Sequence, residues 1–252
     1  MSQDSLEKEQ PLVAHLLELR TRILRMFYCF ILIFACLFPF ANDIYSTLSL
    51  PLREVLPADT HMIATDVISP FFTPLKLTFA LAFFLSVPFI LYQVWGFIAP
   101  GLYSHEKRLA APILVSSVVL FFLGMMFAYY VVLPMLFRFT VGIELQGVST
   151  MTDISKYLDL VLQMFFAFGF AFEIPVATVL LILSGVTTPE SLAAKRRYIV
   201  VGCFVIGMFL TPPDIISQTM LALPMWMLFE AGLLFGRMAI KNRPREDEPS
   251  AS

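Results

Sequence analysis

The sequence predicts an all-α integral membrane protein, with six kinked transmembrane helices in a curved, concave bundle and both termini in the cytoplasm. The chain has 252 residues, 58% hydrophobic and 14% charged, whereas soluble domains carry about 25% charged residues. Residues 77–105 and 109–137 contain no Asp, Glu, Lys or Arg, and each run exceeds the roughly 20 residues that span a bilayer. A net charge of −2 without a basic domain excludes nucleic acid as a partner.

Hydrophobic runs and the polar or proline-rich segments between them define the six expected spans. They cover residues 23–42, 75–98, 112–133, 158–183, 198–210 and 215–235. Prolines lie within or beside several runs, and membrane helices tolerate the kinks that they cause. We expect Thr73-Pro74 to begin the second span and Thr188-Pro189 to begin a short helix, each with a capping hydroxyl before the proline.

The distribution of cations predicts the orientation. Thirteen of the 17 Lys and Arg residues fall on the side of the termini, which the positive-inside rule assigns to the cytoplasm. Residues 1–237 are expected to form a single six-span membrane domain. Its amphipathic N-terminal helix, 11–25, runs into the first span, and residues 238–252 form a disordered cytoplasmic tail.

The fifth span is short. Thirteen residues extend about 20 Å, against a hydrocarbon core of about 30 Å. One interpretation extends the helix into Arg196 and Arg197, whose long side chains snorkel to the surface. The other places the turn Thr211-Pro212-Pro213-Asp214 below the far surface, so that the bilayer thins around this hairpin.

Residue patterns argue against an enzyme and against a bound cofactor or metal. Cys29, Cys36 and Cys203 lie in apolar runs without a CxxC or Cys/His cluster, so neither a disulfide framework nor a zinc site is indicated. HExxH, GxGD and P-loop patterns are missing from the sequence. The alternative is an ion-coupled small-molecule secondary transporter with Glu173 as its proton site, although a single deep carboxylate without an internal repeat argues against it.

Two carboxylates on the basic cytoplasmic side have two interpretations each. Glu18 stands four residues before Arg22, which is typical of a surface ion pair. Glu106 follows Ser104, so it suits the first turn of a capped third helix. Both glutamates also suit a binding site for a cationic ligand.

Two further glutamates lie within spans. Glu173 interrupts the apolar stretch 160–183, where an ionisable group is costly and is a candidate functional residue. It either bonds the carbonyl freed by Pro175 or faces a pocket. Glu230 is assigned to ordinary interfacial packing, and Asp214 has a structural role as the cap of the sixth helix.

Five motifs resemble the TatC family, the multispanning subunit of the twin-arginine protein translocase. The resemblance covers nearly everything from Gln10 to Arg237, and Ser104 stands where many members have a basic residue. The motifs are His15-Leu16-Leu17-Glu18-Leu19-Arg20, Ser69-Pro70-Phe71-Phe72, Phe97-Ile98-Ala99-Pro100-Gly101-Leu102 followed by Glu106, Phe172-Glu173-Ile174-Pro175, and Thr211-Pro212-Pro213-Asp214 with Gln218.

The resemblance implies a multi-pass protein of the bacterial cytoplasmic (inner) membrane. Such a subunit binds the twin-arginine signal peptides of folded cargo proteins and exports that cargo with TatA and TatB, driven by the proton-motive force. Its other partners are further TatC copies and membrane lipid. The implied signal-peptide-binding residues are Glu18, Arg20, Phe97 and Glu106.

The remaining implied sites lie elsewhere in the chain. Glu173 faces an intramembrane polar pocket that meets the signal peptide or a single-span partner. Thr211, Asp214 and Gln218 form the docking patch for TatA or TatB. Pro51, Pro70 and Phe71 belong to a folded periplasmic loop that contacts neighbouring TatC copies.

Overall fold

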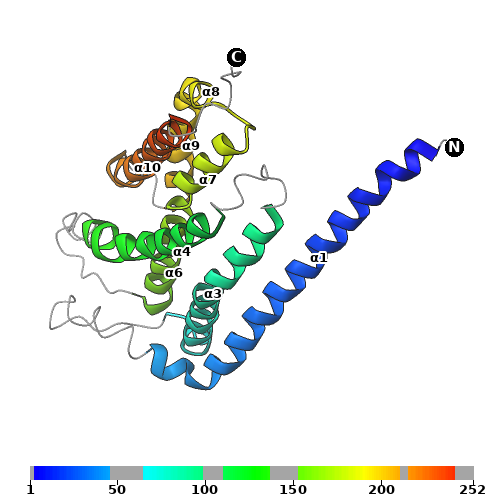
Figure 1. The fold of residues 1–252 in the computed structure, drawn as a ribbon. Coiled ribbons are helices and arrows are strands. Elements are labelled where there is room, and N and C mark those ends of the chain that lie inside the picture. Colours follow the sequence, from blue (N-terminus) through cyan, green and yellow to red (C-terminus); the bar gives the residue numbers. More distant parts are fainter. Residues whose placement is uncertain (1–2, 46–64, 99–109, 137–152, 211–214, 242–252) are drawn as a thin grey trace, which may run out of the picture. The chain divides into compact units, whose positions relative to one another are not determined.

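The computed structural model describes residues 3–45, 65–98, 110–136, 153–210 and 215–241, and its elements are helices (Figure 1), which confirms the all-α fold class. Their bounds are α1 Gln3–Leu37, η1 Phe38–Phe40, α3 Ser69–Ile98, α4 Ala110–Phe127, the π-helical turn η4 Ala128–Val132, α6 Ile154–Ala171, α7 Ile174–Leu183, α8 Pro189–Ala194, α9 Arg196–Leu210 and α10 Ile215–Lys241.

Within the part of the chain that the structure describes, five helices or pairs of consecutive helices are long and apolar enough to cross a membrane. They correspond to predicted spans one to four and six: His15–Tyr45, Ser69–Phe97, Ala111–Leu136, Ile154–Leu183 and Gln218–Lys241. The predicted fifth span corresponds to α9, which has 15 residues and a length of about 22 Å. Because α9 begins at Arg196, it includes both arginines that the first interpretation of this short span required.

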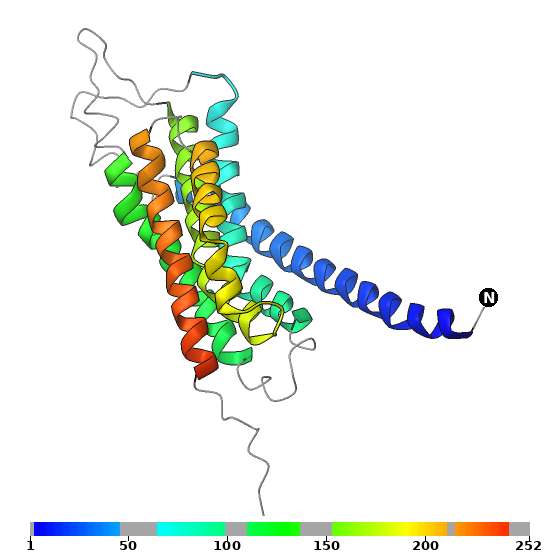
Figure 2. The same ribbon diagram turned by 90° about the horizontal axis from the view of Figure 1, so that it is seen from above.

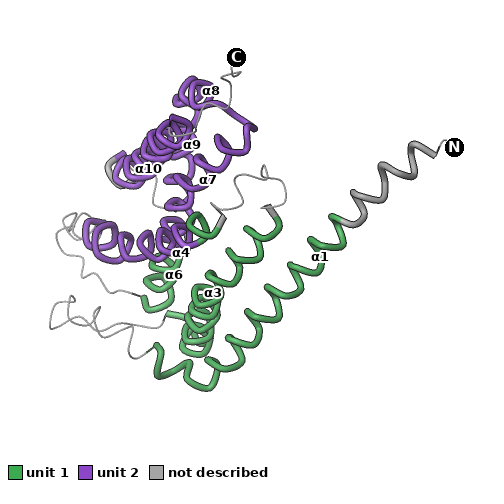
Figure 3. The backbone as a smooth tube through the Cα atoms, in the orientation of Figure 1, with its two compact units in different colours: residues 1–101, 107–114, 145–162 green, residues 102–106, 115–144, 163–252 purple. Residues whose placement is uncertain are grey.

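The chain divides into two compact units (Figure 3). Unit 1 comprises residues 1–101, 107–114 and 145–162, and unit 2 comprises residues 102–106, 115–144 and 163–252. In unit 1, α1 packs along α3. The rings of Phe30 and Phe34 lie 4.8 and 5.8 Å from that of Phe79, so aromatic contacts join these two helices.

In unit 2, α10 packs against both α7 and α9 (Figure 2). Gly232 and Gly236 lie one turn apart on α10 and face Pro175 and Ile182 of α7. Small residues at this spacing let two helix backbones approach closely in a membrane protein. A glycine also allows a close approach between α4 and α6, because Gly124 lies against the Phe168 carbonyl.

The predicted start of the second span is wrong. Helix α3 begins at Ser69, with Pro70 in its first turn, so Thr73 and Pro74 lie inside it. Thr73 is buried, and its hydroxyl pairs with that of Ser155 at 3.1 Å instead of capping the helix. Helix α3 therefore begins before the predicted apolar run, and Thr73 connects it to α6.

The predicted helix start at Thr188 is confirmed. Its hydroxyl accepts a hydrogen bond from the Ser191 amide at 3.2 Å, and Pro189 is the first helical residue. Proline also breaks the fourth span, because α6 ends at Ala171 and α7 begins at Ile174, immediately before Pro175.

Both ends of the chain differ in helix length from the prediction. Helix α1 begins at Gln3, so it contains the whole predicted amphipathic segment 11–25 and continues into the first span. Helix α10 ends at Lys241, so residues 238–241 of the predicted tail are helical. Residues 242–252 lie outside the described ranges.

Candidate signal site and its surroundings

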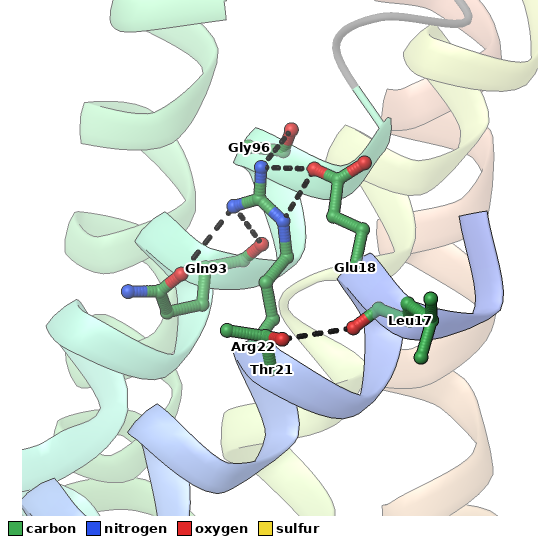
Figure 4. Close-up of polar contacts among 6 residues, drawn as sticks. All are labelled: Leu17, Glu18, Thr21, Arg22, Gln93 and Gly96. Atoms are coloured by element: carbon green, nitrogen blue, oxygen red, sulfur yellow. Dashed lines mark hydrogen bonds and ion pairs between the residues drawn. The ribbon is translucent and has the colours of Figure 1, made fainter. Parts of the chain in front are cut away.

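Arg22 lies where α1 meets the end of α3 (Figure 4). Its Nε and Nη2 atoms donate to one oxygen of Glu18, Oε1, at 2.9 and 2.6 Å. Glu18 precedes Arg22 by one helical turn, which is the spacing that lets side chains of one helix meet. The pair that the sequence predicted is therefore present.

The other face of the Arg22 guanidinium binds α3. Nη2 donates to the Gly96 carbonyl at 3.0 Å, and Nη1 donates to the backbone and side-chain oxygens of Gln93, both at 3.3 Å. Because α3 ends at Ile98, the Gly96 carbonyl is one of the last four, which lack partners within the helix. A cation at this end is also favoured by the helix dipole.

Gly96 makes room for the guanidinium. A Cβ atom at this position would lie 2.5 Å from Nη1 of Arg22, which is closer than any ordinary contact. The glycine therefore lets Arg22 approach the backbone of α3 directly.

The side chains of Arg22 and Glu18 differ in their exposure to solvent. The Arg22 side chain is 19% exposed, whereas that of Glu18 is 40% exposed. Among the described residues, no hydrogen bond reaches the second oxygen of Glu18, Oε2 (Figure 4). A carboxylate accepts from about four directions, so Glu18 retains capacity for a further donor.

An aromatic stack joins the same two helices. The rings of His15 and Phe97 lie 4.2 Å apart at an interplanar angle of 19°. His15 precedes Glu18 on α1, and Phe97 follows Gly96 on α3. The stack therefore fixes the N-terminal side of the Glu18 turn against the end of α3.

Glu18 and Phe97 thus both belong to the contact between α1 and α3, whereas Arg20 is exposed on α1. Glu106 lies outside the described residues. Sequence reasoning missed Gln93 and Gly96, and it treated Arg22 only as a surface partner. Gln93 could have been found, because an amide that interrupts an apolar run needs a partner.

Glu173, in unit 2, lies in the break between α6 and α7. It is half-buried and forms a hydrogen bond with the buried Ser117 of α4. The predicted bond to the carbonyl freed by Pro175 is not seen, and Oε1 of Glu173 has no partner among the described residues. The position of this carboxylate is set by a side chain on another helix.

Gln218 links α10 to α9. Its amide nitrogen donates to the Phe204 carbonyl at 2.8 Å, and its Cγ lies 3.4 Å from where a Cβ on Gly207 would stand. Thr211 and Asp214, the other members of the predicted docking patch, lie outside the described residues.

Two of the predicted loop residues lie in the first turn of α3, and Pro51 lies outside the described residues. Phe71 is 68% exposed, and its ring contacts that of Phe72 edge to face at 5.4 Å. Pro70 immediately follows Ser69, the first residue of the helix.

Asp153 connects the segment before α3 to the start of α6. One carboxylate oxygen accepts from the amides of Ser155 and Lys156, and the other accepts from the amide and hydroxyl of Thr65. These bonds, that from the Thr65 hydroxyl first and that from the Lys156 amide next, lower the pKa of Asp153 to about 2. Asp153 therefore acts as the helix cap.

Glu230 has a specific partner, which the sequence interpretation of ordinary packing missed. Arg196 at the start of α9 approaches its two oxygens through Nε at 2.6 Å and Nη2 at 2.7 Å. The pair therefore has one hydrogen bond, from Nη2 to Oε2, because the Oε1 that Nε approaches accepts none from the described residues. It joins α9 to α10 within unit 2.

Comparison with known proteins agrees across sequence and structure. Residues 14–224 match the family model described as Sec-independent protein translocase protein (TatC). The chain is 57% identical over 246 residues to the TatC protein of Azotobacter chroococcum mcd 1, covering 98% of this chain and 95% of that protein. It is 56% identical over 244 residues to the TatC protein of Escherichia coli K12, covering 96% and 95%.

A solved structure is also similar. The crystal structure of a twin-arginine translocase receptor, TatC, superposes with a TM-score of 0.80 at 38% sequence identity. The match covers 90% of this chain and 99% of that structure.

Proposed function

Because the chain belongs to the TatC family of Sec-independent protein translocase proteins, we propose that it is the signal-peptide receptor and core subunit of a twin-arginine translocase. In this role it exports folded proteins across the bacterial cytoplasmic membrane, together with TatA and TatB and driven by the proton-motive force. Its function is protein transport rather than catalysis.

The proposed topology has six spans, with α9 as the fifth and both termini in the cytoplasm. Residues 1–237 act as one membrane domain, and the residues after the end of α10 form a cytoplasmic tail. The bias of cations toward the side of the termini supports this orientation. Labelling of single cysteines from either side of the membrane tests it, and a periplasmic C-terminus would refute it.

The exposed carboxylate of Glu18 is the observation that carries the receptor role. It lies at the junction of α1 and α3 beside the His15–Phe97 stack. A guanidinium binds a carboxylate through two parallel hydrogen bonds, which the ammonium of lysine does not reproduce. We propose that Glu18, with Arg20, Phe97 and Glu106, recognises the paired arginines of the signal.

Binding of a labelled twin-arginine signal peptide to the full chain in nanodiscs tests this role. Loss of one charge-assisted bond, worth about 1.5–3 kcal/mol, predicts that Glu18→Gln or Glu106→Gln weakens binding roughly 10- to 100-fold. Glu190→Gln is the matched control, because Glu190 is an exposed carboxylate in the first turn of α8.

Two results would contradict the receptor role. One is equal binding by the wild type and both site variants at low and high salt. The other is normal export of folded twin-arginine cargo after deletion of the gene. Complementation of that deletion with the Glu18→Gln chain should restore little export, whereas the Glu190→Gln chain should restore it fully.

The proposed docking site for TatA or TatB is the patch Thr211, Asp214 and Gln218. Polar side chains among lipids hold partner helices through hydrogen bonds. Crosslinking from position 218 should trap a TatB adduct in the resting complex, whereas the exposed Met238 of the same helix should not. Failure to trap the adduct at position 218 would count against the site.

We propose that Glu173 faces a pocket that meets the signal peptide or a single-span partner. Its unpartnered oxygen supports this proposal. A cysteine at position 173 that reacts neither with water-soluble probes nor with partner crosslinkers would refute it. The family match gives the secondary-transporter alternative no support, and substrate-dependent proton flux in liposomes with this chain alone would revive it.

Pro51, together with Pro70 and Phe71 of the first turn of α3, is proposed to contact other TatC copies. The ring of Phe71 supports this, because it is exposed in the first turn of α3. Disulfide crosslinking between copies that carry a cysteine at position 71 tests the contact.

A further inference from the structure

We propose that Arg22 is a positioning residue of the signal site, which holds Glu18 through Oε1 and leaves Oε2 for an arginine of the signal peptide. The inference rests on the proposed function and adds a role to a residue outside the implied signal-binding set. It makes the junction of α1 and α3 a site with one internal guanidinium and space for a second.

The first step is the asymmetry of the Glu18 carboxylate. Both bonds from Arg22 converge on Oε1, at 2.9 and 2.6 Å. No bond from the described residues reaches Oε2, and the side chain is 40% exposed. A second guanidinium therefore finds an acceptor without breaking the first pair.

The second step is that Arg22 is anchored independently of Glu18. Three further bonds connect it to oxygens of Gln93 and Gly96 on α3, and its side chain is only 19% exposed. An anchored arginine orders the Glu18 side chain before the ligand arrives, so less conformational entropy is lost on binding.

The opposite role for Arg22 is that of a competitor, which would occupy the position on Glu18 that an arginine of the signal peptide takes. Displacing Arg22 would remove the donor from two backbone carbonyls of α3, those of Gln93 and Gly96, and unpaired carbonyls are costly where water is scarce. These hydrogen bonds to α3 thus favour the role of Arg22 as an anchor for Glu18. The two roles predict opposite signs, because removing a competitor tightens signal binding and removing an anchor weakens it.

Four variants of the full chain in nanodiscs, probed with a labelled Arg-Arg signal peptide and its Lys-Lys counterpart, test the proposal. Arg22→Gln removes the anchor, and Arg22→Lys keeps the charge without the two-pronged geometry. Gly96→Ala keeps Arg22 but places a Cβ 2.5 Å from Nη1, which moves the guanidinium. Arg25→Gln is the matched control, because Arg25 is exposed on the same helix.

We expect Arg22→Gln to weaken binding of the Arg-Arg peptide about 10-fold, the equivalent of one charge-assisted bond. Gly96→Ala should weaken it less, because the atom that the added Cβ meets is the end of a flexible side chain. Arg22→Lys should fall between Arg22→Gln and the wild type, and Arg25→Gln should bind like the wild type. On the Glu18→Gln background, Arg22→Gln should cause no further loss, because it acts through Glu18.

Three results would overturn the proposal: tighter binding by Arg22→Gln, equal binding by Arg22→Gln and Arg25→Gln, or full additivity with Glu18→Gln. If Arg22→Gln does not fold, the same comparisons with Arg22→Lys decide the matter. A wild-type chain that does not discriminate the Arg-Arg from the Lys-Lys peptide would instead refute the proposed function.

Discussion

Replacing Gly232 by alanine tests whether direct backbone contact holds α10 against α7. The added Cβ would lie 2.7 Å from Cα of Pro175 and 3.0 Å from Cβ of Thr178. These atoms belong to the backbone or adjoin it, so rotation of a flexible side chain does not relieve the contact. The two helices must separate, and the packing between them weakens.

The size of the effect follows from two opposing contributions. Overpacking a well-packed interface costs about 1–3 kcal/mol, whereas alanine is favoured over glycine within a helix by up to ~1 kcal/mol. The net loss is therefore about 0–3 kcal/mol, whereas the difference from a glycine-to-alanine change that meets no clash is the full 1–3 kcal/mol. At about 2–4 °C for each kcal/mol in a chain of this size, the Tm should lie about 2–12 °C below that of such a clash-free variant.

Thermal unfolding of the purified full chain in one detergent is the assay. Gly202→Ala in α9 is the matched control, because a Cβ there has no atom within 4 Å. The control should keep its Tm or gain slightly from its higher helix propensity. Equal shifts of the two variants would show that the contact between α7 and α10 is not close enough to exclude a methyl group.

Three further predictions concern ionic contacts. Asp153, with its pKa lowered to about 2, stabilises the fold fully above about pH 4. The Tm advantage of the wild type over Asp153→Asn should therefore shrink as pH falls from 4 to 2, and a constant difference would contradict this. A double-mutant cycle on Lys76 and Asp159, 49% and 45% exposed, should give a coupling below about 1 kcal/mol. The pair of Arg196 and Glu230, 46% and 29% exposed, should give a larger coupling in the same assay because its carboxylate is less exposed to solvent, and the reverse order would refute the argument.

Hydropathy predicted the helices well because a membrane span depends mainly on its own composition. Five of the six predicted spans have a helix of sufficient length and apolarity. Their ends were less predictable, since they depend on contacts with other helices. Thr73 illustrates this, because its hydroxyl meets Ser155, and residue pairing across 82 positions leaves no local pattern in the sequence.

Kinks were only partly predictable from proline. Pro175 does mark the break between α6 and α7, but Pro74 and Pro88 lie inside the continuous helix α3. The π-helical turn Ala128–Val132 contains no proline or glycine. A π turn adds one residue to a helical turn, and no residue type within this turn marks it in the sequence.

The two sequence interpretations of Glu18 prove compatible rather than exclusive. An ion pair with Arg22 and a site for an external cation both require acceptor oxygens of one carboxylate. In the structure the pair uses Oε1 alone, because Gln93 and Gly96 hold the guanidinium from its other side. Sequence spacing identifies which residues meet on one helix. The availability of Oε2 of Glu18, however, depends on the bonds from Arg22 to Gln93 and Gly96, which lie 71 and 74 residues away on α3. That long-range contact turns an ordinary helical ion pair into a candidate recognition site.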